Sequence, residues 1–161
     1  MLRRAGRGFD QLSRPWLCFG VTIYHEGTKS TKGTKEKAFS LALSHQVIGA
    51  AIEVHRLIGP GLLESVYEVA LCKELSIRGV GVERQVRVPV NYKGQELNCD
   101  VRLDLLVERT VIVEVKTVEK LIPLHRAQLL TYLRLRNLWL GLLVNFNVEV
   151  LREGVRRVLN G

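Results

Sequence analysis

The chain has 161 residues, of which 47% are hydrophobic and 25% charged, and its formal net charge is +8. This composition is typical of a soluble globular protein with one domain and its own core. No apolar run approaches the ~20 residues that span a bilayer, and the short apolar stretch near the N-terminus lacks a convincing cleavage site, so we expect neither a membrane partner nor a signal peptide.

The three cysteines give no sign of a disulfide framework. Cys18, Cys72 and Cys99 are odd in number and show no CxxC spacing. Such cysteines are typical of reduced thiols, and a zinc site would need more closely spaced ligands. We therefore expect a cytoplasmic protein without structural zinc.

The basic excess is concentrated near the N-terminus. Residues 1–40 contain eight Lys and Arg against three Asp and Glu, whereas the remaining 121 residues contain sixteen against thirteen. The first segment is also rich in Gly, Ser and Thr, a composition typical of disorder. We predict a disordered basic tail over 1–40 and one folded domain over 41–161, whose mild charge is weak evidence for a polyanionic partner.

Two helices are predicted at the start of the domain. Apolar residues recur at helical spacing from about Leu41, and Ser40 or Ser44 is a candidate cap for the first helix. Gly59-Pro60-Gly61 ends that helix, and LLESVYEVALCKELSIR forms a second one that stops at Gly79.

The period then changes to that of β-strands. Alternating residues over 82–92 predict a strand with one solvated face, and Lys93-Gly94 is a turn. Further along the chain we expect strands over 96–107 and 111–116, a helix from Pro123 through HRAQLLTYLRLRN, a strand LGLLVNFNV and an edge strand within VLREGVRRVLN. This order predicts an α/β fold in which helices flank a mixed sheet.

Charged residues interrupt two of the most apolar strands. In VIVEVK, side-chain alternation puts Glu114 and Lys116 on one face. If residues 108–110 form the hairpin loop, Asp104 lies opposite Glu114, with Cβ atoms about 5 Å apart. A two-residue loop would shift the register by one residue and separate the acids.

Two explanations fit this acidic pair. Opposed carboxylates repel each other unless a cation lies between them, and hard oxygen ligands suit Mg²⁺ or Mn²⁺. Lys116 would add a positive charge, and such a set can activate water and stabilise a phosphorane. The alternative is a solvated hairpin face with a cross-strand contact between lysine and carboxylate.

Three motifs in order favour the first explanation. Leu103-Asp104 followed by Glu114-Val115-Lys116 resembles the signature of the PD-(D/E)XK nuclease superfamily, with Leu103 in place of a proline that is not a ligand. Residues 61–67 read GxxExxY, the motif that names one branch of that superfamily. Residues 128–132 resemble the QxxxY helix of its exonuclease-like members. The likeness extends over about 44–158 and implies a restriction-endonuclease-like core.

The resemblance also implies roles for individual residues. Asp104 and Glu114 would be metal ligands, together with the backbone carbonyl of Val115, and Glu64 would reach the metal or its water from the second helix. Lys116 would orient the attacking water or stabilise transition-state charge, so that the catalytic set is Asp104, Glu114, Lys116 and Glu64.

Substrate contacts are expected from one helix. Gln128 and Tyr132 share a helix face and would line the site, and His125 and Arg126 would contact phosphate. For His125, a role at the helix terminus is an equal alternative. Tyr67, in the GxxExxY segment, is predicted to be a core aromatic with a hydrogen-bonded hydroxyl.

The leading hypothesis is therefore a Mg²⁺-dependent nuclease that hydrolyses phosphodiester bonds in nucleic acid, with DNA preferred to RNA as substrate. The alternative is a catalytically silent nucleic-acid-binding or interaction module that retains the fold. No motif in the sequence identifies a specificity for bases. The apolar helix faces and the mixed sheet lead us to expect a homodimer.

Overall fold

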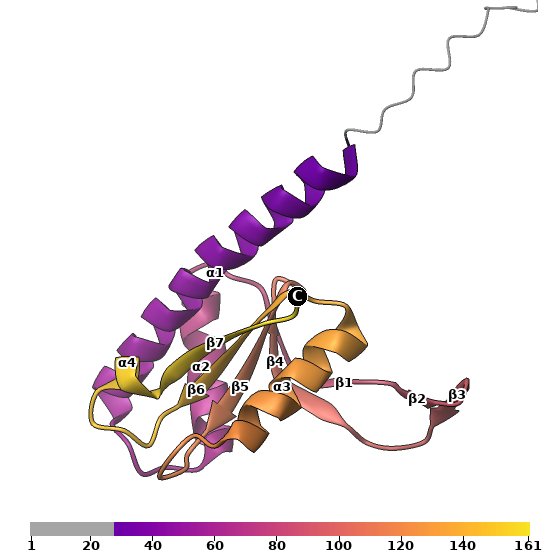
Figure 1. The fold of residues 1–161 in the computed structure, drawn as a ribbon. Coiled ribbons are helices and arrows are strands. Elements are labelled where there is room, and N and C mark those ends of the chain that lie inside the picture. Colours follow the sequence, from indigo (N-terminus) through magenta and orange to yellow (C-terminus); the bar gives the residue numbers. More distant parts are fainter. Residues whose placement is uncertain (1–27) are drawn as a thin grey trace, which may run out of the picture.

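A five-stranded mixed sheet with helices on both faces forms the centre of the molecule (Figure 1). The computed structural model describes residues 28–161. Its elements are α1 (Thr28–Ile58), α2 (Glu64–Ile77), β1 (Val82–Arg87), β2 (Val90–Tyr92), β3 (Gln95–Leu97), β4 (Arg102–Val107), β5 (Val111–Lys116), α3 (Pro123–Arg136), β6 (Leu140–Asn145), α4 (Leu151–Gly154) and β7 (Val155–Leu159). The strand order is β1-β4-β5-β6-β7; β5 and β6 are parallel and the other neighbours antiparallel.

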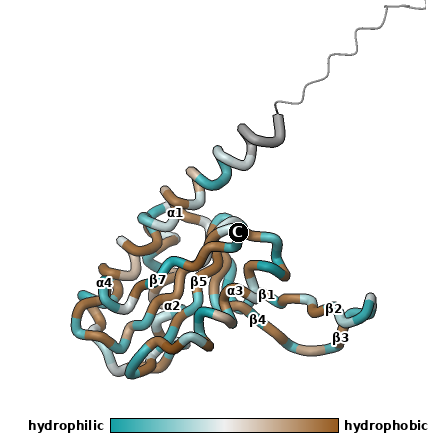
Figure 2. The backbone as a smooth tube through the Cα atoms, viewed as in Figure 1, coloured by the Kyte–Doolittle hydropathy of each residue, from teal (hydrophilic) through white to brown (hydrophobic). Residues whose placement is uncertain are grey.

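The two faces of the sheet have separate cores. α1 and α2 pack on one face, where Val111, Val113 and Val115 of β5 are buried. α3 packs on the other face, where Ile112 is buried with Leu129. The predicted alternation along β5 is thus confirmed, and Figure 2 shows hydrophobic segments concentrated in the central strands.

The first helix begins earlier than predicted. α1 starts at Thr28, so residues 28–40 are helical where we predicted a disordered tail. Ser40 and Ser44 are no caps, because their hydroxyls donate to the carbonyls of Glu36 and Leu41 within the helix. Lys37 also lies over the Trp139 ring, 5.3 Å from its centroid, a contact that the composition of the segment does not reveal. The rest of the predicted tail, residues 1–27, lies outside the described residues.

The GxxExxY segment, residues 61–67, begins in the turn between α1 and α2 and continues into the first turn of α2. Gly59 and Gly61 have φ values of 75° and 98°, which glycine adopts without steric cost. Tyr67 is fully buried and stacks on Phe146 with ring centroids 4.3 Å apart. Its hydroxyl donates to the Gly59 carbonyl at 2.6 Å, which confirms the predicted core role. This turn fixes the start of α2, where Glu64 lies.

Two predicted strands are each divided in the structure. The strand expected over 82–92 breaks between β1 and β2, because Pro89 has no N–H for a ladder. The strand expected over 96–107 breaks between β3 and β4. The short hairpin of β2 and β3 extends away from the sheet as a separate two-stranded unit (Figure 1).

A glycine lets α3 approach the sheet closely. A Cβ at Gly141 of β6 would lie 2.7 Å from Leu129 Cδ1, closer than van der Waals contact allows. Leu129 is fully buried against this strand. Gln128 and Tyr132 lie on the same helix, one residue before and three residues after Leu129.

Candidate active site

The hairpin of β4 and β5 has the register that a three-residue loop predicts. Leu105 pairs with Val113, Leu106 with Ile112 and Val107 with Val111, and residues 108–110 form the turn. Glu108 and Arg109 have positive φ values of 47° and 53°, which allows the chain to reverse. The two-residue loop that would have separated the acids is not formed.

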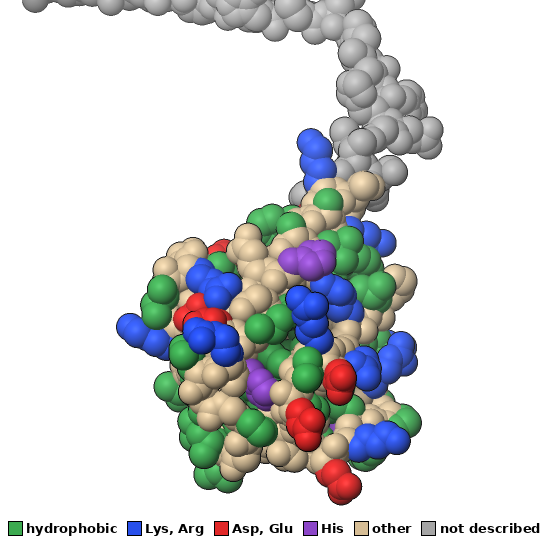
Figure 3. Space-filling view, turned by 90° about the vertical axis from the view of Figure 1, so that its left-hand side faces the viewer, with side chains coloured by type: hydrophobic (Ala, Val, Ile, Leu, Met, Phe, Trp, Pro, Cys, Tyr) green, Lys and Arg blue, Asp and Glu red, His purple; other side chains and the backbone are tan. Residues whose placement is uncertain are grey.

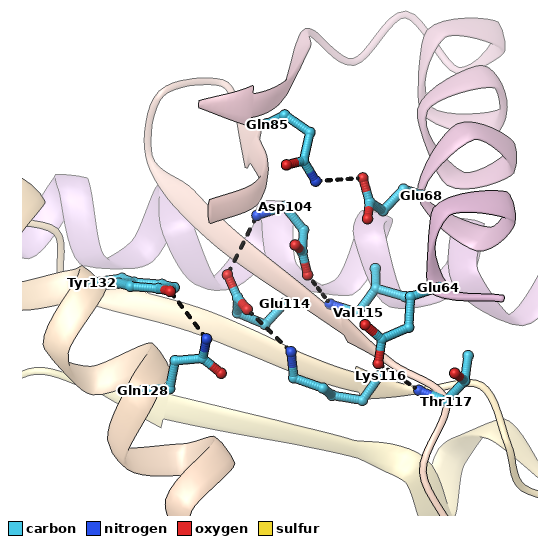
Figure 4. Close-up of polar contacts among 10 residues, drawn as sticks. All are labelled: Glu64, Glu68, Gln85, Asp104, Glu114, Val115, Lys116, Thr117, Gln128 and Tyr132. Carbon is cyan, nitrogen blue, oxygen red and sulfur yellow. Dashed lines mark hydrogen bonds and ion pairs between the residues drawn. The ribbon is translucent and has the colours of Figure 1, made fainter. Parts of the chain in front are cut away.

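Regular pairing ends where the acidic residues begin. Beyond Leu105, the Val115 N–H donates to Asp104 Oδ2 at 2.9 Å, so a side chain replaces a backbone carbonyl as its acceptor. The Asp104 N–H in turn points at Glu114 Oε1, 3.4 Å away. The two carboxylates therefore lie side by side where β4 diverges from β5 (Figure 4).

Lys116 completes this group. Its Nζ is 3.5 Å from Glu114 Oε2 and its side chain is only 13% exposed. Glu114 is almost completely buried, with a relative exposure of 2%. An ionised carboxylate at this depth needs a compensating positive charge. The Lys116 ammonium at 3.5 Å supplies only part of that compensation, because Asp104 is a second acid beside the same carboxylate.

Burial perturbs both acids. Desolvation, followed by repulsion from Asp104, raises the pKa of Glu114 to about 8, although Lys116 acts in the opposite direction. Desolvation also raises the pKa of Asp104, against the hydrogen bond from Val115 and the charge of Lys116. Strongly perturbed acids that share a site are typical of functional positions.

Glu64 lies at the margin of the acidic pair. It is the first residue of α2, and its Oε1 accepts a hydrogen bond from the Thr117 N–H at 3.1 Å. It therefore contacts the chain directly after Lys116. Within residues 28–161, however, no group of three or more His, Cys, Asp or Glu side chains is arranged to hold a metal ion, so Glu64 does not join Asp104 and Glu114 in a preformed cage.

The predicted substrate-binding residues divide into two groups. Gln128 Nε2 donates to the Tyr132 hydroxyl at 3.0 Å, and Figure 4 shows this pair approaching Glu114 and Lys116 from α3. His125 instead accepts a hydrogen bond at Nδ1 from the Ile122 N–H, 3.3 Å away. This contact corresponds to the alternative role for His125, at the terminus of the helix. Arg126 is exposed on the first turn of α3.

Three polar residues around the site were missed by the sequence analysis. Asn145, 1% exposed at the end of β6, bonds through its amide to both the N–H and the carbonyl of Val118 and so fixes the loop after Lys116. Glu68 lies one turn after Glu64 on α2 and accepts a hydrogen bond from Gln85 at 2.8 Å. For Asn145 the sequence contains one signal, an asparagine within the apolar run LGLLVNF; for Glu68 and Gln85 it contains none.

Other predictions concern chemistry away from this site. Cys72 and Cys99 are free thiols, and burial raises the pKa of Cys72 to about 11. Cys18 lies outside the described residues. Among the helices over 28–161, none combines the length and apolarity needed to cross a membrane.

The chain was compared with protein families, curated proteins and solved structures. Residues 41–158 match the sequence model of the PD-(D/E)XK nuclease superfamily. No curated protein and no solved structure gives a significant match. The mixed sheet flanked by helices also confirms the restriction-endonuclease-like core that the resemblance implied. With the family match extending over most of its length, the chain belongs to the PD-(D/E)XK nuclease superfamily.

Proposed function

We propose that this protein is a metal-dependent nuclease of the GxxExxY branch of its superfamily, and that it hydrolyses phosphodiester bonds in DNA. The observation that carries this proposal is the adjacent pair of acids, the partly buried Asp104 and the buried Glu114, with Lys116 beside them. The GxxExxY motif supports assignment to this branch. Its Glu64 contacts the chain next to Lys116, and its Tyr67 lies in the core and holds the turn before α2.

The donor set fits Mg²⁺ or Mn²⁺. Two carboxylates side by side are hard oxygen ligands, and a divalent cation would remove the repulsion that contributes to the raised pKa of Glu114. Asp104 and Glu114 would hold the ion, with the Val115 carbonyl and Glu64 as further ligands. Because such ions keep several waters, a site with only two adjacent acids suffices.

The residues around the pair suit phosphodiester hydrolysis. A bound ion would supply Lewis-acid activation of a water molecule and neutralise phosphate charge. Lys116 would stabilise the negative charge that develops as the water oxygen bonds to phosphorus. The water would release its proton to solvent as its oxygen bonds to phosphorus, the bond to the leaving oxygen would break, and that oxygen would take up a proton from solvent. Gln128 and Tyr132 would hold the substrate from α3.

Charge on the surface contributes less to the proposal than the site does. On the face with α1 and α4, drawn in Figure 3, basic side chains are interspersed with acidic and hydrophobic ones. Arg126 would add a phosphate contact at the site. The homodimer stays a prediction, supported by exposed hydrophobic side chains around the start of α2, namely Leu62, Leu63, Val66 and Val69.

Cleavage assays on four substrates test the proposed function. The purified protein is incubated with single- and double-stranded DNA and RNA, with Mg²⁺ or Mn²⁺ and with a chelator. We expect cleavage of DNA that requires the metal and stops in Asp104→Ala. Lack of cleavage on all four substrates, with nucleic-acid binding retained, would instead favour the silent binding module.

A further inference from the structure

The antiparallel ladder between β1 and β4 is interrupted at one position. Arg84 pairs with Leu105 and Val86 with Leu103, but Gln85 and Asp104, which the same register would pair, are not bridged. Gln85 has a φ of 50°, a left-handed conformation that is uncommon for residues other than glycine. The distortion therefore lies directly opposite a predicted metal ligand.

At this interruption the side chains of both strands change the face of the sheet on which they lie. On a regular strand, residues two apart share a face. Leu105 nevertheless packs in the core beneath α1 and α2, whereas Leu103 packs in the core beneath α3. Val82 and Val86 of β1 divide between the two cores in the same way. Asp104, at this twist, is also outside the regular pairing of β4 with β5, and its carboxylate accepts the hydrogen bond from the Val115 N–H.

A buried acid holds the distorted residue in place. Gln85 Nε2 donates to Glu68 Oε2 at 2.8 Å, and Glu68 is only 5% exposed. Arg84 donates to the same oxygen at 3.2 Å. Glu68 follows Glu64 by four residues, so one face of α2 directs both acids toward the site (Figure 4).

We propose that Gln85, anchored by Glu68, is a positioning residue that sets the orientation of Asp104. Backbone strain of this kind persists only where the surroundings enforce it, and the hydrogen bond to Glu68 supplies that constraint. Gln85 acts through the backbone of β4 and needs no contact with metal or substrate. The proposal rests on the proposed function, because orienting Asp104 matters for catalysis only if Asp104 holds the ion.

Two measurements test the role of this pair. In the first, NMR follows hydrogen exchange of the Val115 amide, which bonds to Asp104, with the Val113 amide as an internal reference. In Gln85→Ala and Glu68→Ala we expect faster exchange at Val115 and little change at Val113. The second is calorimetric titration with Mn²⁺, where we expect affinity to fall about tenfold, as for other residues that orient metal ligands.

Matched variants separate positioning from general damage. Glu83, on the same strand as Gln85, pairs with Arg109 in the turn between β4 and β5. Glu83→Ala removes this ion pair and should leave Val115 exchange and Mn²⁺ affinity unchanged. Glu68→Gln keeps an acceptor for Gln85 and should restore both to near wild type. If Gln85→Ala does not fold, Gln85→Gly replaces it, because glycine tolerates the left-handed backbone while losing the anchor.

The outcomes are distinguishable from those of the proposed function. Wild-type exchange at Val115 in Glu68→Ala and in a folded Gln85 variant would overturn the positioning role. If the wild-type protein binds no Mn²⁺, the proposed function fails, but exchange at Val115 still decides whether Gln85 and Glu68 orient Asp104.

Discussion

Replacing Lys116 by alanine is expected to lower kcat by ~10²–10³ while leaving Mn²⁺ affinity within a few-fold of wild type. The Lys116 ammonium lies 3.5 Å from Glu114 and is largely shielded from water, so it can stabilise charge that develops in the transition state. It contributes no ligand atom to an ion between the two acids. A lysine in this role therefore affects turnover more than binding.

Single-turnover cleavage and calorimetry together measure this separation. Lys120→Ala, in the exposed loop four residues further on, removes the same charge and is expected to cleave at close to the wild-type rate. Cleavage by Lys116→Ala at the wild-type rate would show that the lysine has no catalytic role.

The second large effect concerns stability without metal. The pKa of Glu114 is raised to about 8 by burial and by Asp104, so the folded protein binds this proton more tightly than the unfolded chain does. The free energy of unfolding in chelator should therefore fall as pH rises from about 5 to about 8, by about 2–3 kcal/mol. Glu114→Gln, which cannot ionise, should show little of this decrease in the free energy of unfolding and should be more stable than wild type at pH 8.

Urea unfolding at several pH values measures this difference. Glu119→Gln is the control, because Glu119 is exposed in the loop after β5 and should follow the wild-type curve. Adding Mn²⁺ at pH 8 should stabilise wild type but not Glu114→Gln. Parallel pH curves for wild type and Glu114→Gln would show that burial of this acid has no such cost.

The hairpin register that brings Asp104 and Glu114 together could be predicted because the relevant information is local. The polar residues 108–110 between two apolar runs determine the loop length, and the loop length determines which residues of β4 and β5 face each other. Pro123 likewise predicts the first residue of α3. These features depend on spacing along the chain, which a single sequence contains.

Features that depend on contacts between distant segments were not predictable. Glu68 and Gln85 meet across 17 positions, and Asn145 reaches Val118 across 27; neither contact leaves a pattern in spacing. The start of α1 was predicted too late because Gly, Ser and Thr dominated the composition, whereas the helix extends back to Thr28. Alternation over 82–92 predicts one strand, but Pro89 has no N–H for a ladder and lies where β1 and β2 separate.

Calorimetric titration with Mn²⁺ tests most directly whether Asp104 and Glu114 share one cation. The titration uses wild-type protein at pH 8, close to the pKa of about 8 of Glu114, so that a large fraction of this acid is already ionised. Asp104→Ala and Glu114→Ala are titrated in the same way, and circular dichroism confirms that both variants are folded. We predict binding to wild type and loss of detectable binding in each variant. Binding that survives unchanged in both variants would contradict the shared metal site.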